Sequence, residues 1–383
     1  MKTRVLFIID SLGCGGAEKS LVSLLTLLDY SRLDVYLSIV SRGGVFEQYI
    51  PESVNLVLFP RPSRFLETVS NGLFSLLFHL LPVLGIKRHG AELGWVCRHR
   101  FFPAFEGDYD VAVAYHQGFP TYYVSEKVRA CRKVAWINID MEKAGYRSGF
   151  NRPFYDRMSK VCVVSEALSG MLPDAGFVNR DSLCVVHDII NPELIRQMST
   201  ATDANEAIVA PLTLLTVGRI VPQKNYLLAV ETARVLAEKG VDFRWIFVGD
   251  GPDRTKVENR IKKYQLENIV FLAGMLPNPY PYFAMCDIYV QTSSFEGFGI
   301  TLSEAKIFHK PIVTTCFPSA YDQIMDEENG LIAEMNAESL AEKILSIIKN
   351  PSLRDHLIEG TQNEENRTVE TESAKVNSLL LTI

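Results

Sequence analysis

The sequence predicts an α/β protein with two domains, each built around a parallel sheet. At 383 residues the chain is longer than one typical domain and can bury two separate cores. Short apolar runs, such as residues 5–9 and 213–217, alternate with segments of helical length and spacing. The run at 5–9 is apolar at every position, which is typical of parallel strands covered by helices on both faces.

The domain boundary is expected at the polar stretch 199–206, which is the best linker in the chain. The first domain then covers residues 1–200, and the second covers residues 201–365. A tail at 366–383 begins polar and ends apolar.

Composition restricts the class of protein. Charged residues make up 22% and hydrophobic residues 47% of the chain, as in soluble globular proteins. No domain is strongly basic, which argues against nucleic-acid binding. The seven cysteines form no Cys-x-x-Cys pair, which indicates a reducing, cytoplasmic compartment and no zinc site. The most apolar stretch, 72–86, contains His79 and Pro82 and is too short to span a membrane.

The first strand is followed by a glycine-rich loop. Residues 5–9 form the apolar strand, and apolar residues recur at helical spacing from 17 to 28. The loop between them contains Gly15 and Gly16, but Glu18 stands where a dinucleotide-binding loop has its last glycine. The loop therefore does not fit a dinucleotide-binding turn, and an ordinary strand-to-helix turn is one interpretation of it.

Two strands of the second half end in residues suited to a ligand, and the bases after the first of them suit a phosphate. Strand 213–217 leads into Arg219 and Lys224, and strand 243–248 ends at Gly249. Ligands of open α/β sheets bind at the carboxyl ends of the strands. Arginine can bind phosphate through two parallel hydrogen bonds, while lysine acts as a point charge. The alternative is that both bases are ordinary solvated side chains.

A third strand, 288–292, runs into two glutamates eight positions apart, Glu296 and Glu304. The glycines at 297 and 299 form a turn, and residues 300–308 read as a helix that stops before a proline. Two acceptors at a fixed separation beside a helix N-terminus suit a ligand with two sets of vicinal hydroxyls, such as a nucleotide sugar. The alternative is a capped surface helix with two solvated acids.

These motifs, in this order, resemble the second domain of the retaining GT-B glycosyltransferases, the group 1 (GT4) family. The likeness rests on residues 217–225, 249–251 and 294–305, and it extends over about residues 4 to 350. The resemblance implies two Rossmann-like domains with parallel sheets facing a central cleft. It further implies that the acceptor binds the first domain, that the nucleotide sugar binds the second, and that the tail at 366–383 returns to the first domain as a helix.

The resemblance also assigns roles within the donor site. Arg219 and Lys224 would bind the donor diphosphate, Glu304 the ribose hydroxyls and Glu296 a hexose hydroxyl. The remaining donor contacts would come from the closing loop at Gly15 and Gly16, the turn at Gly249, the base-facing loop at Met275 and Leu276, and the hexose-lining backbone of Phe298, Gly299 and Ile300.

The chain departs from the family pattern at two positions. Asn138 stands where many members carry a histidine that contacts the transferring centre, and asparagine can hydrogen-bond but cannot transfer a proton. Asp188 stands where asparagine is usual. His116, after a predicted strand, is either a partial substitute for the missing imidazole or a structural residue.

The resemblance therefore implies a retaining hexosyltransferase. It would move a hexose or N-acetylhexosamine from a nucleotide-diphosphate sugar to a saccharide or lipid-linked acceptor in surface polysaccharide or glycan biosynthesis. Catalysis would involve Glu296, Arg219, Lys224 and Asn138, with no cofactor and no obligatory metal. Two alternatives remain, a non-catalytic partner subunit and a sugar-nucleotide epimerase.

Segment 61–104 predicts a peripheral membrane contact. It carries six bases against two acids among many apolar residues, a combination that suits an anionic bilayer. The protein would then be cytoplasmic and associated with the inner face of the cell membrane. The alternative is an ordinary core helix with a solvated basic rim.

Overall fold

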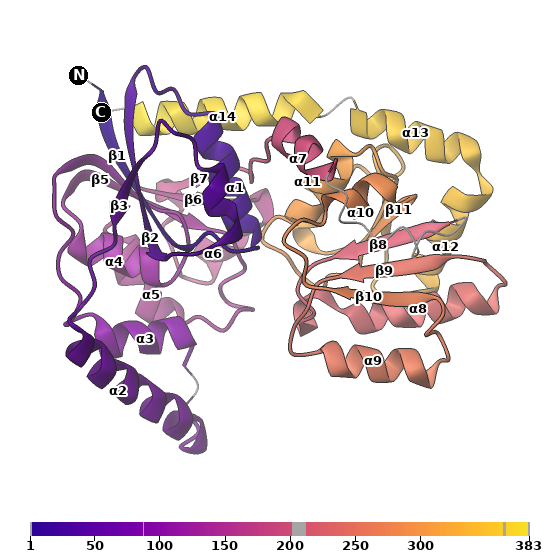
Figure 1. Ribbon diagram of the computed structural model, residues 1–383, viewed down its shortest axis with the longest axis horizontal. Coiled ribbons are helices and arrows are strands. Elements are labelled where there is room, and N and C mark those ends of the chain that lie inside the picture. Colours follow the sequence, from indigo (N-terminus) through magenta and orange to yellow (C-terminus); the bar gives the residue numbers. More distant parts are fainter. Residues whose placement is uncertain (1, 87, 201–211, 363–364, 382–383) are drawn as a thin grey trace. The chain divides into compact units, whose positions relative to one another are not determined.

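Two parallel sheets organise the chain, one in each of two structural units (Figure 1). The computed structural model describes residues 2–86, 88–200, 212–362 and 365–381. The N-terminal unit comprises Met1–Ile189 together with Thr371–Ile383, and the C-terminal unit comprises Ile190–Glu370. The predicted α/β class with two parallel sheets is confirmed.

The sheet of the N-terminal unit has the strand order β3-β2-β1-β4-β5-β6-β7, and every neighbouring pair is parallel. The apolar run at 5–9 lies within the central strand β1 and is buried throughout, which explains why it is apolar at every position. The strands are β1 (Thr3–Ser11), β2 (Leu33–Ser41), β3 (Asn55–Leu58), β4 (Tyr109–Ala114), β5 (Ala130–Ile137), β6 (Lys160–Val163) and β7 (Leu183–Val185).

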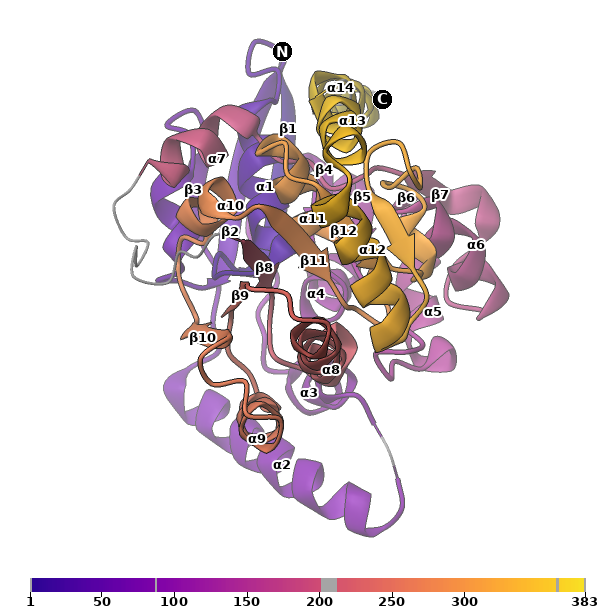
Figure 2. The ribbon, with the colours of Figure 1, turned by 90° about the vertical axis from the view of Figure 1, so that its right-hand side faces the viewer.

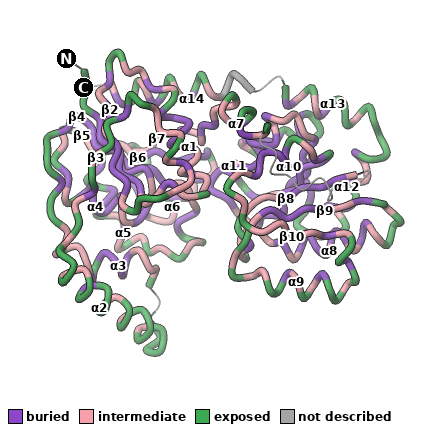
Figure 3. Tube along the Cα trace, viewed as in Figure 1, coloured by how far each residue is buried: buried purple, intermediate pink, exposed green. Residues whose placement is uncertain are grey.

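Helices α1 to α6 lie in the connections between strands of this sheet, as parallel pairing requires, whereas α14 returns to the unit from the end of the chain. Helix α2 differs from the others, because most of its length is exposed (Figure 3). The helices are α1 (Gly16–Thr26), α2 (Arg64–Val83), α3 (Gly90–Arg98), α4 (Phe119–Lys127), α5 (Ser148–Tyr155), α6 (Glu166–Asp174) and, from Thr371 on, α14 (Glu365–Leu381).

The C-terminal sheet repeats the arrangement with the order β10-β9-β8-β11-β12-β13. Its core contains Leu214, Trp245, Phe247 and Val290. Helices α8, α9 and α12 lie on one side of the sheet, and α10 and α11 lie on the other (Figures 1 and 2). The strands are β8 (Thr213–Val217), β9 (Arg244–Val248), β10 (Val270–Gly274), β11 (Ile288–Gln291), β12 (Ile312–Thr315) and β13 (Leu331–Ala333). The helices are α7 (Pro192–Ser199), α8 (Tyr226–Glu238), α9 (Arg254–Lys263), α10 (Tyr280–Met285), α11 (Ile300–Ile307), α12 (Ala337–Lys349) and α13 (Pro351–Gln362).

In both sheets, the order in which strands are added reverses at the equivalent position. The chain adds strands outward from the first strand, then returns to its other side, between β1 and β4 and between β8 and β11. This is the Rossmann-type order, and a crevice for ligands lies outside the carboxyl ends of the strands at such a reversal.

The units divide near residue 190, whereas the sequence suggested a boundary at 200. Helix α7 belongs to the C-terminal unit, because Asn278 Nδ2 donates to the carbonyl of Met198 over 2.7 Å and Arg196 reaches the carbonyl of Ile307. Of the predicted linker 199–206, residues 201–206 lie outside the described residues.

Helix α14 packs onto the N-terminal unit through polar contacts. Asn377 accepts from the backbone N–H of Asp29 over 2.9 Å, and Arg132 donates to the carbonyls of Leu379 and Leu380. Near the start of this packed segment, Glu372 accepts from the backbone N–H of His187 over 3.0 Å and contacts the His187 ring.

Burial alone would raise the pKa of Glu372. The hydrogen bonds from His187 and Lys375 outweigh that effect, so the pKa is lowered. The carboxylate is thus held in its charged form beside His187, near the end of the segment Met1–Ile189.

Asp188 carries a carboxyl group shielded from water. Its Oδ1 has no hydrogen-bond partner among the described residues. Burial raises its pKa from 3.8 to about 7, against the lowering effect of the Ser20 hydroxyl. Between these two pH values the folded state holds a proton that the unfolded state has lost, so stability falls as the pH rises through this window.

We therefore expect Asp188→Asn to raise the free energy of unfolding at pH 8 by on the order of a few kcal/mol, and to change it little at pH 4. Urea unfolding at the two pH values measures this, with the exposed Asp181→Asn as the matched control. A gain of equal size at both pH values would show that the charge of Asp188 is not the cause.

Candidate functional site

The loops after β8 and β9 pack against each other too closely to allow side chains. Gly249 has a φ of +150°, and a Cβ added there would lie 1.8 Å from the carbonyl oxygen of Gly218. A Cβ at Gly251 would lie 2.3 Å from the carbonyl oxygen of Ile220. The glycines at 249 and 251 are therefore required by the packing of these loops, whatever they contribute to a ligand.

Arg219 and Lys224 sit at the carboxyl end of β8, where the sequence predicted them. Arg219 is exposed, and its guanidinium has no hydrogen-bond or ion-pair partner among the described residues. Lys224 precedes α8, and the left-handed Asn225, with φ of +50°, joins the two. An exposed guanidinium at this position can bind an anion without first losing another contact.

Lys224 forms an ion pair with Glu296. Its Nζ lies 2.5 Å from Glu296 Oε1, and both side chains are largely buried. The sequence assigned these residues to different parts of one ligand, whereas the structure brings them into direct contact. In this arrangement neither group can bind a ligand without sharing or exchanging its partner.

The Glu296 carboxylate is held from several sides. Ser293 Oγ donates to Oε1 over 2.6 Å, and Gln291 Nε2 donates to the same oxygen over 3.3 Å. Gln223 Nε2 reaches Oε2 over 3.2 Å. These contacts keep the acid close to the end of β11.

The glycine turn that follows Glu296 is anchored at both ends. Ser294 N–H donates to the carbonyl of Gln223 over 2.7 Å, which ties the loop to the one carrying Lys224. On the other side, Gln323 Nε2 donates to the carbonyl of Phe298 over 2.7 Å. Gly299 caps α11 with a φ of +92°, so the helix begins at Ile300. The carbonyl of Phe298 is thus occupied, and the N–H groups at this helix start are the ones suited to an anion or hydroxyl.

Glu304 lies one turn into α11 and is fully buried. Tyr280, at the start of α10, donates its hydroxyl to Glu304 Oε1 over 2.9 Å. The sequence analysis missed Tyr280, although it follows the predicted base-facing loop. That loop joins β10 to α10, with Met275 exposed and Leu276 half-buried.

The N-terminal unit has a separate polar cluster at the ends of β1, β4 and β5. His116 Nδ1 lies 3.0 Å from Asp10 Oδ2. Gln117 links the cluster, since its Nε2 lies 3.1 Å from His116 Nε2 and its Oε1 accepts from the backbone N–H of Asn138 over 3.0 Å. Asn138 Oδ1 is shielded from solvent and has no hydrogen-bond partner among the described residues. The sequence named His116 and Asn138 but not Asp10 or Gln117.

Gly15 and Gly16 begin α1, as predicted. A Cβ at Gly15 would lie 2.1 Å from Glu18 Oε2, so the Glu18 side chain folds back over the loop. In the described parts of the chain, no group of three or more histidine, cysteine or acidic side chains could hold a metal ion.

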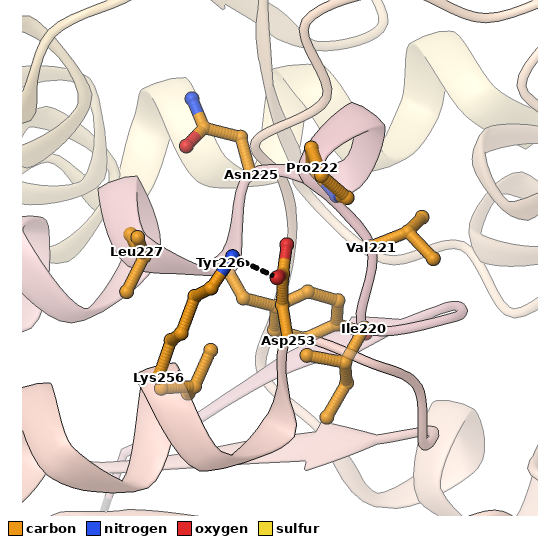
Figure 4. Close-up of a pocket in the computed structure, with 9 residues that line it drawn as sticks. Ile220, Val221, Pro222, Asn225, Tyr226, Leu227, Asp253 and Lys256 are labelled. Atoms are coloured by element: carbon orange, nitrogen blue, oxygen red, sulfur yellow. Dashed lines mark ion pairs between the residues drawn. The ribbon is translucent and has the colours of Figure 1, made fainter. Parts of the chain in front are cut away.

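A cavity of about 230 Å³ lies beside the loop that follows β8 and carries Arg219 and Lys224 (Figure 4). Its lining includes none of Arg219, Lys224 and Glu296. It does include an ion pair between Lys256 Nζ and Asp253 Oδ1, 2.6 Å apart. This cavity is therefore not the predicted donor site. Its lining is Ile220, Val221, Pro222, Asn225, Tyr226, Leu227, Asp253, Lys256 and Val257.

Comparison with known proteins finds similarity in the second part of the chain. Residues 200–364 match the model of the glycosyl transferases group 1. An uncharacterized glycosyltransferase of Methanocaldococcus jannaschii is 34% identical over 145 residues, which cover 37% of this chain and 40% of that protein. The poly(ribitol-phosphate) alpha-N-acetylglucosaminyltransferase of Staphylococcus aureus is 33% identical over 36% of this chain and 28% of its own length. The chain thus spans less than half the length of these curated relatives.

Solved structures match over the whole chain. HepE of Anabaena, in complex with UDP and glucose, superimposes with a TM-score of 0.74 at 17% identity and covers 100% of both chains. TarM of S. aureus gives a TM-score of 0.71 at 15% identity, also over 100% of both chains. The fold is therefore GT-B, with two Rossmann-like domains, and residues 200–364 are similar to the glycosyl transferases group 1.

Proposed function

We propose that the protein is a retaining GT4 glycosyltransferase that moves a hexose or N-acetylhexosamine from a nucleotide-diphosphate sugar to a saccharide acceptor, in polysaccharide or glycan biosynthesis. The observation that carries this proposal is the grouping of Arg219, Lys224 and Glu296 around one sheet edge, at the reversal of strand order between β8 and β11. The printed activities of relatives support it, including the poly(glycerol-phosphate) alpha-glucosyltransferase of Bacillus subtilis.

Donor binding would begin at Arg219 and then exchange the partner of Lys224. The exposed guanidinium attracts the diphosphate first. Lys224 then turns its ammonium from Glu296 toward the phosphate, and the released carboxylate accepts hydrogen bonds from hexose hydroxyls. The diphosphate and the sugar are thereby recognised together, because a nucleoside diphosphate alone offers no partner for the displaced acid.

The chemical step breaks the bond between the anomeric carbon and the phosphate oxygen. The acceptor oxygen attacks from the same face, and a phosphate oxygen of the leaving group takes the acceptor proton. Arg219 and Lys224 stabilise the charge that develops on the diphosphate, so we propose that no metal is required.

In this proposal Glu304 and the polar cluster of the N-terminal unit have different roles. Glu304, oriented by Tyr280, binds ribose hydroxyls. In the N-terminal unit, Asp10 orients the His116 ring, while Asn138 serves as a hydrogen-bonding group and not as a base. The acceptor binds this unit in our proposal.

A panel of nucleotide sugars, assayed with and without saccharide acceptors, tests the proposal. We expect release of nucleoside diphosphate that depends on the acceptor, a product with the donor's anomeric configuration by NMR, and a rate unchanged by EDTA. Conversion of the donor without an acceptor would indicate an epimerase. Donor binding without turnover on any acceptor would favour a non-catalytic partner subunit, for which Asn138 is the supporting observation.

Arg219→Ala should weaken binding of nucleoside diphosphate by about ten- to a hundredfold, the equivalent of about 1.5–3 kcal/mol for one charge-assisted contact. Its free energy of unfolding should stay close to wild type, because the side chain has no intramolecular partner in the described chain. Isothermal titration with UDP and GDP measures the first quantity. Lys256→Ala, which removes a nearby base outside the proposed site, is the control and should bind normally.

Lys224→Ala should weaken diphosphate binding and also lower stability by about 1–3 kcal/mol, because it leaves the Glu296 carboxylate without its cation. Adding Glu296→Gln should restore stability but not binding. Thermal melts and titrations of both variants separate the two effects. If the double variant regained diphosphate affinity, Lys224 would be structural and not a ligand.

Tyr280→Phe should weaken every ribose-containing ligand by about tenfold, because one hydrogen bond that orients Glu304 is lost. Tyr264→Phe, in the same unit but outside the site, serves as the control. Affinity for UDP, compared with that for pyrophosphate, is the measurement. An equal loss for pyrophosphate would place the effect on the phosphate loop instead of on the ribose.

A further inference from the structure

Helix α2 is largely uncovered, although most of its side chains are apolar. Of its described residues, only Ser70 is buried. The helix has the length and hydropathy of a membrane-spanning segment. The sequence analysis judged the stretch 72–86 too short for this, but the helix starts at Arg64, two turns earlier, and includes further apolar residues. Apolar surface of this extent indicates a partner.

One face of α2 packs against α3 and fixes the helix to its unit. The half-buried residues recur at helical spacing, from Leu66 through Phe74 to Leu81. The guanidinium of Arg98, on α3, lies 4.6 Å from the centre of the Phe74 ring. This face of α2 is therefore covered by α3 and is not available to a partner.

A second apolar stripe lies beside this face and is exposed. Its members are spaced by three or four residues, so they lie along one side of the helix. Three of them are very open, with exposed fractions of 74% for Phe65, 63% for Leu76 and 82% for Val83. The stripe consists of Phe65, Val69, Leu73, Leu76, Leu80 and Val83.

The charges around α2 are mainly positive. Arg64 and Glu67 are the charged residues of the helix itself, and Glu67 pairs with Arg61 over 3.7 Å. Beyond the helix, Arg88 and Arg100 are exposed. The other acid of this segment, Glu92, is buried and paired with Arg147 over 2.9 Å, so it does not offset these bases at the surface. Residue 87, also a base in the sequence, lies outside the described residues.

We propose that α2 docks this protein on an anionic lipid bilayer, with its exposed stripe in the acyl boundary and the flanking arginines on the headgroups. A helix of 20 residues is about 30 Å long and presents a continuous apolar edge without charges after Glu67. Such an edge beside a basic rim is typical of interfacial helices. The packed inner face argues that α2 lies on the membrane and does not cross it.

Lipid binding by α2 does not depend on the proposed transfer reaction. Only its consequence, that the acceptor is carried on a lipid, rests on the proposed function. A failure of lipid binding would leave sugar transfer untouched, and a failure of sugar transfer would leave lipid binding untouched.

Vesicle flotation of the full chain tests the proposal, with phosphatidylcholine vesicles and with vesicles that also contain phosphatidylglycerol. The wild type should float with the anionic vesicles at low salt, less at high salt, and weakly with the neutral ones. Leu76→Glu with Leu80→Glu should reduce partitioning by at least about tenfold. The matched control is Asn71→Glu with Ser75→Glu, which adds the same charge on the polar side of the same helix and should retain most of the binding.

Circular dichroism melts establish that both double variants are folded. The proposal is overturned if the wild type does not float with anionic vesicles at low salt, or if the control loses as much binding as the stripe variant. It is also overturned if light scattering shows a dimer that the stripe substitutions dissociate, because a second copy of the chain would then cover the stripe.

Discussion

The ion pair between Lys224 and Glu296 is the contact on which the C-terminal site depends. It joins the loop after β8 to the loop after β11, and the hydrogen bonds of Gln223 and Ser294 reinforce the same junction. Burying a carboxylate costs free energy unless the charge is paired, so Lys224 and Glu296 hold each other in position. Because the glycine turn and the start of α11 come directly after Glu296, this contact also fixes their position.

The two units place their chemistry at equivalent points. In each sheet, polar side chains gather where the strand order reverses. Asp10 lies at the end of β1 and His116 follows β4, while Lys224 follows β8 and Glu296 follows β11. A strand on either side of the reversal sends its connecting helix to the opposite face, which leaves the carboxyl ends uncovered. The repeated position is therefore a property of the topology, and the differing residues determine what each unit can bind.

Much of this fold could be predicted from the sequence, because the buried parallel strands are short runs rich in apolar and β-branched residues, and their loops carry glycine and polar residues. The pairing of side chains could not be predicted. Lys224 and Glu296 are 72 positions apart, and Asp10 and His116 are 106 apart, so only the folded sheet brings them together. The exposure of α2 was equally hidden, since an apolar helix has the same composition in a core and on a surface. The unit boundary was displaced because tertiary contacts of α7, and not local polarity, decide where it belongs.

The position of α14 has a consequence for the order of folding. Asn377 bonds to Asp29 across 348 positions of sequence, and Glu372 bonds to His187 across 185. During synthesis from the N-terminus, the N-terminal unit lacks these partners until the entire C-terminal unit has been made. The contiguous C-terminal unit can complete its core first, while the N-terminal unit still lacks the hydrogen bonds that α14 makes with Asp29, Arg132 and His187. Of the two units, the one that begins earlier in the sequence is thus completed later.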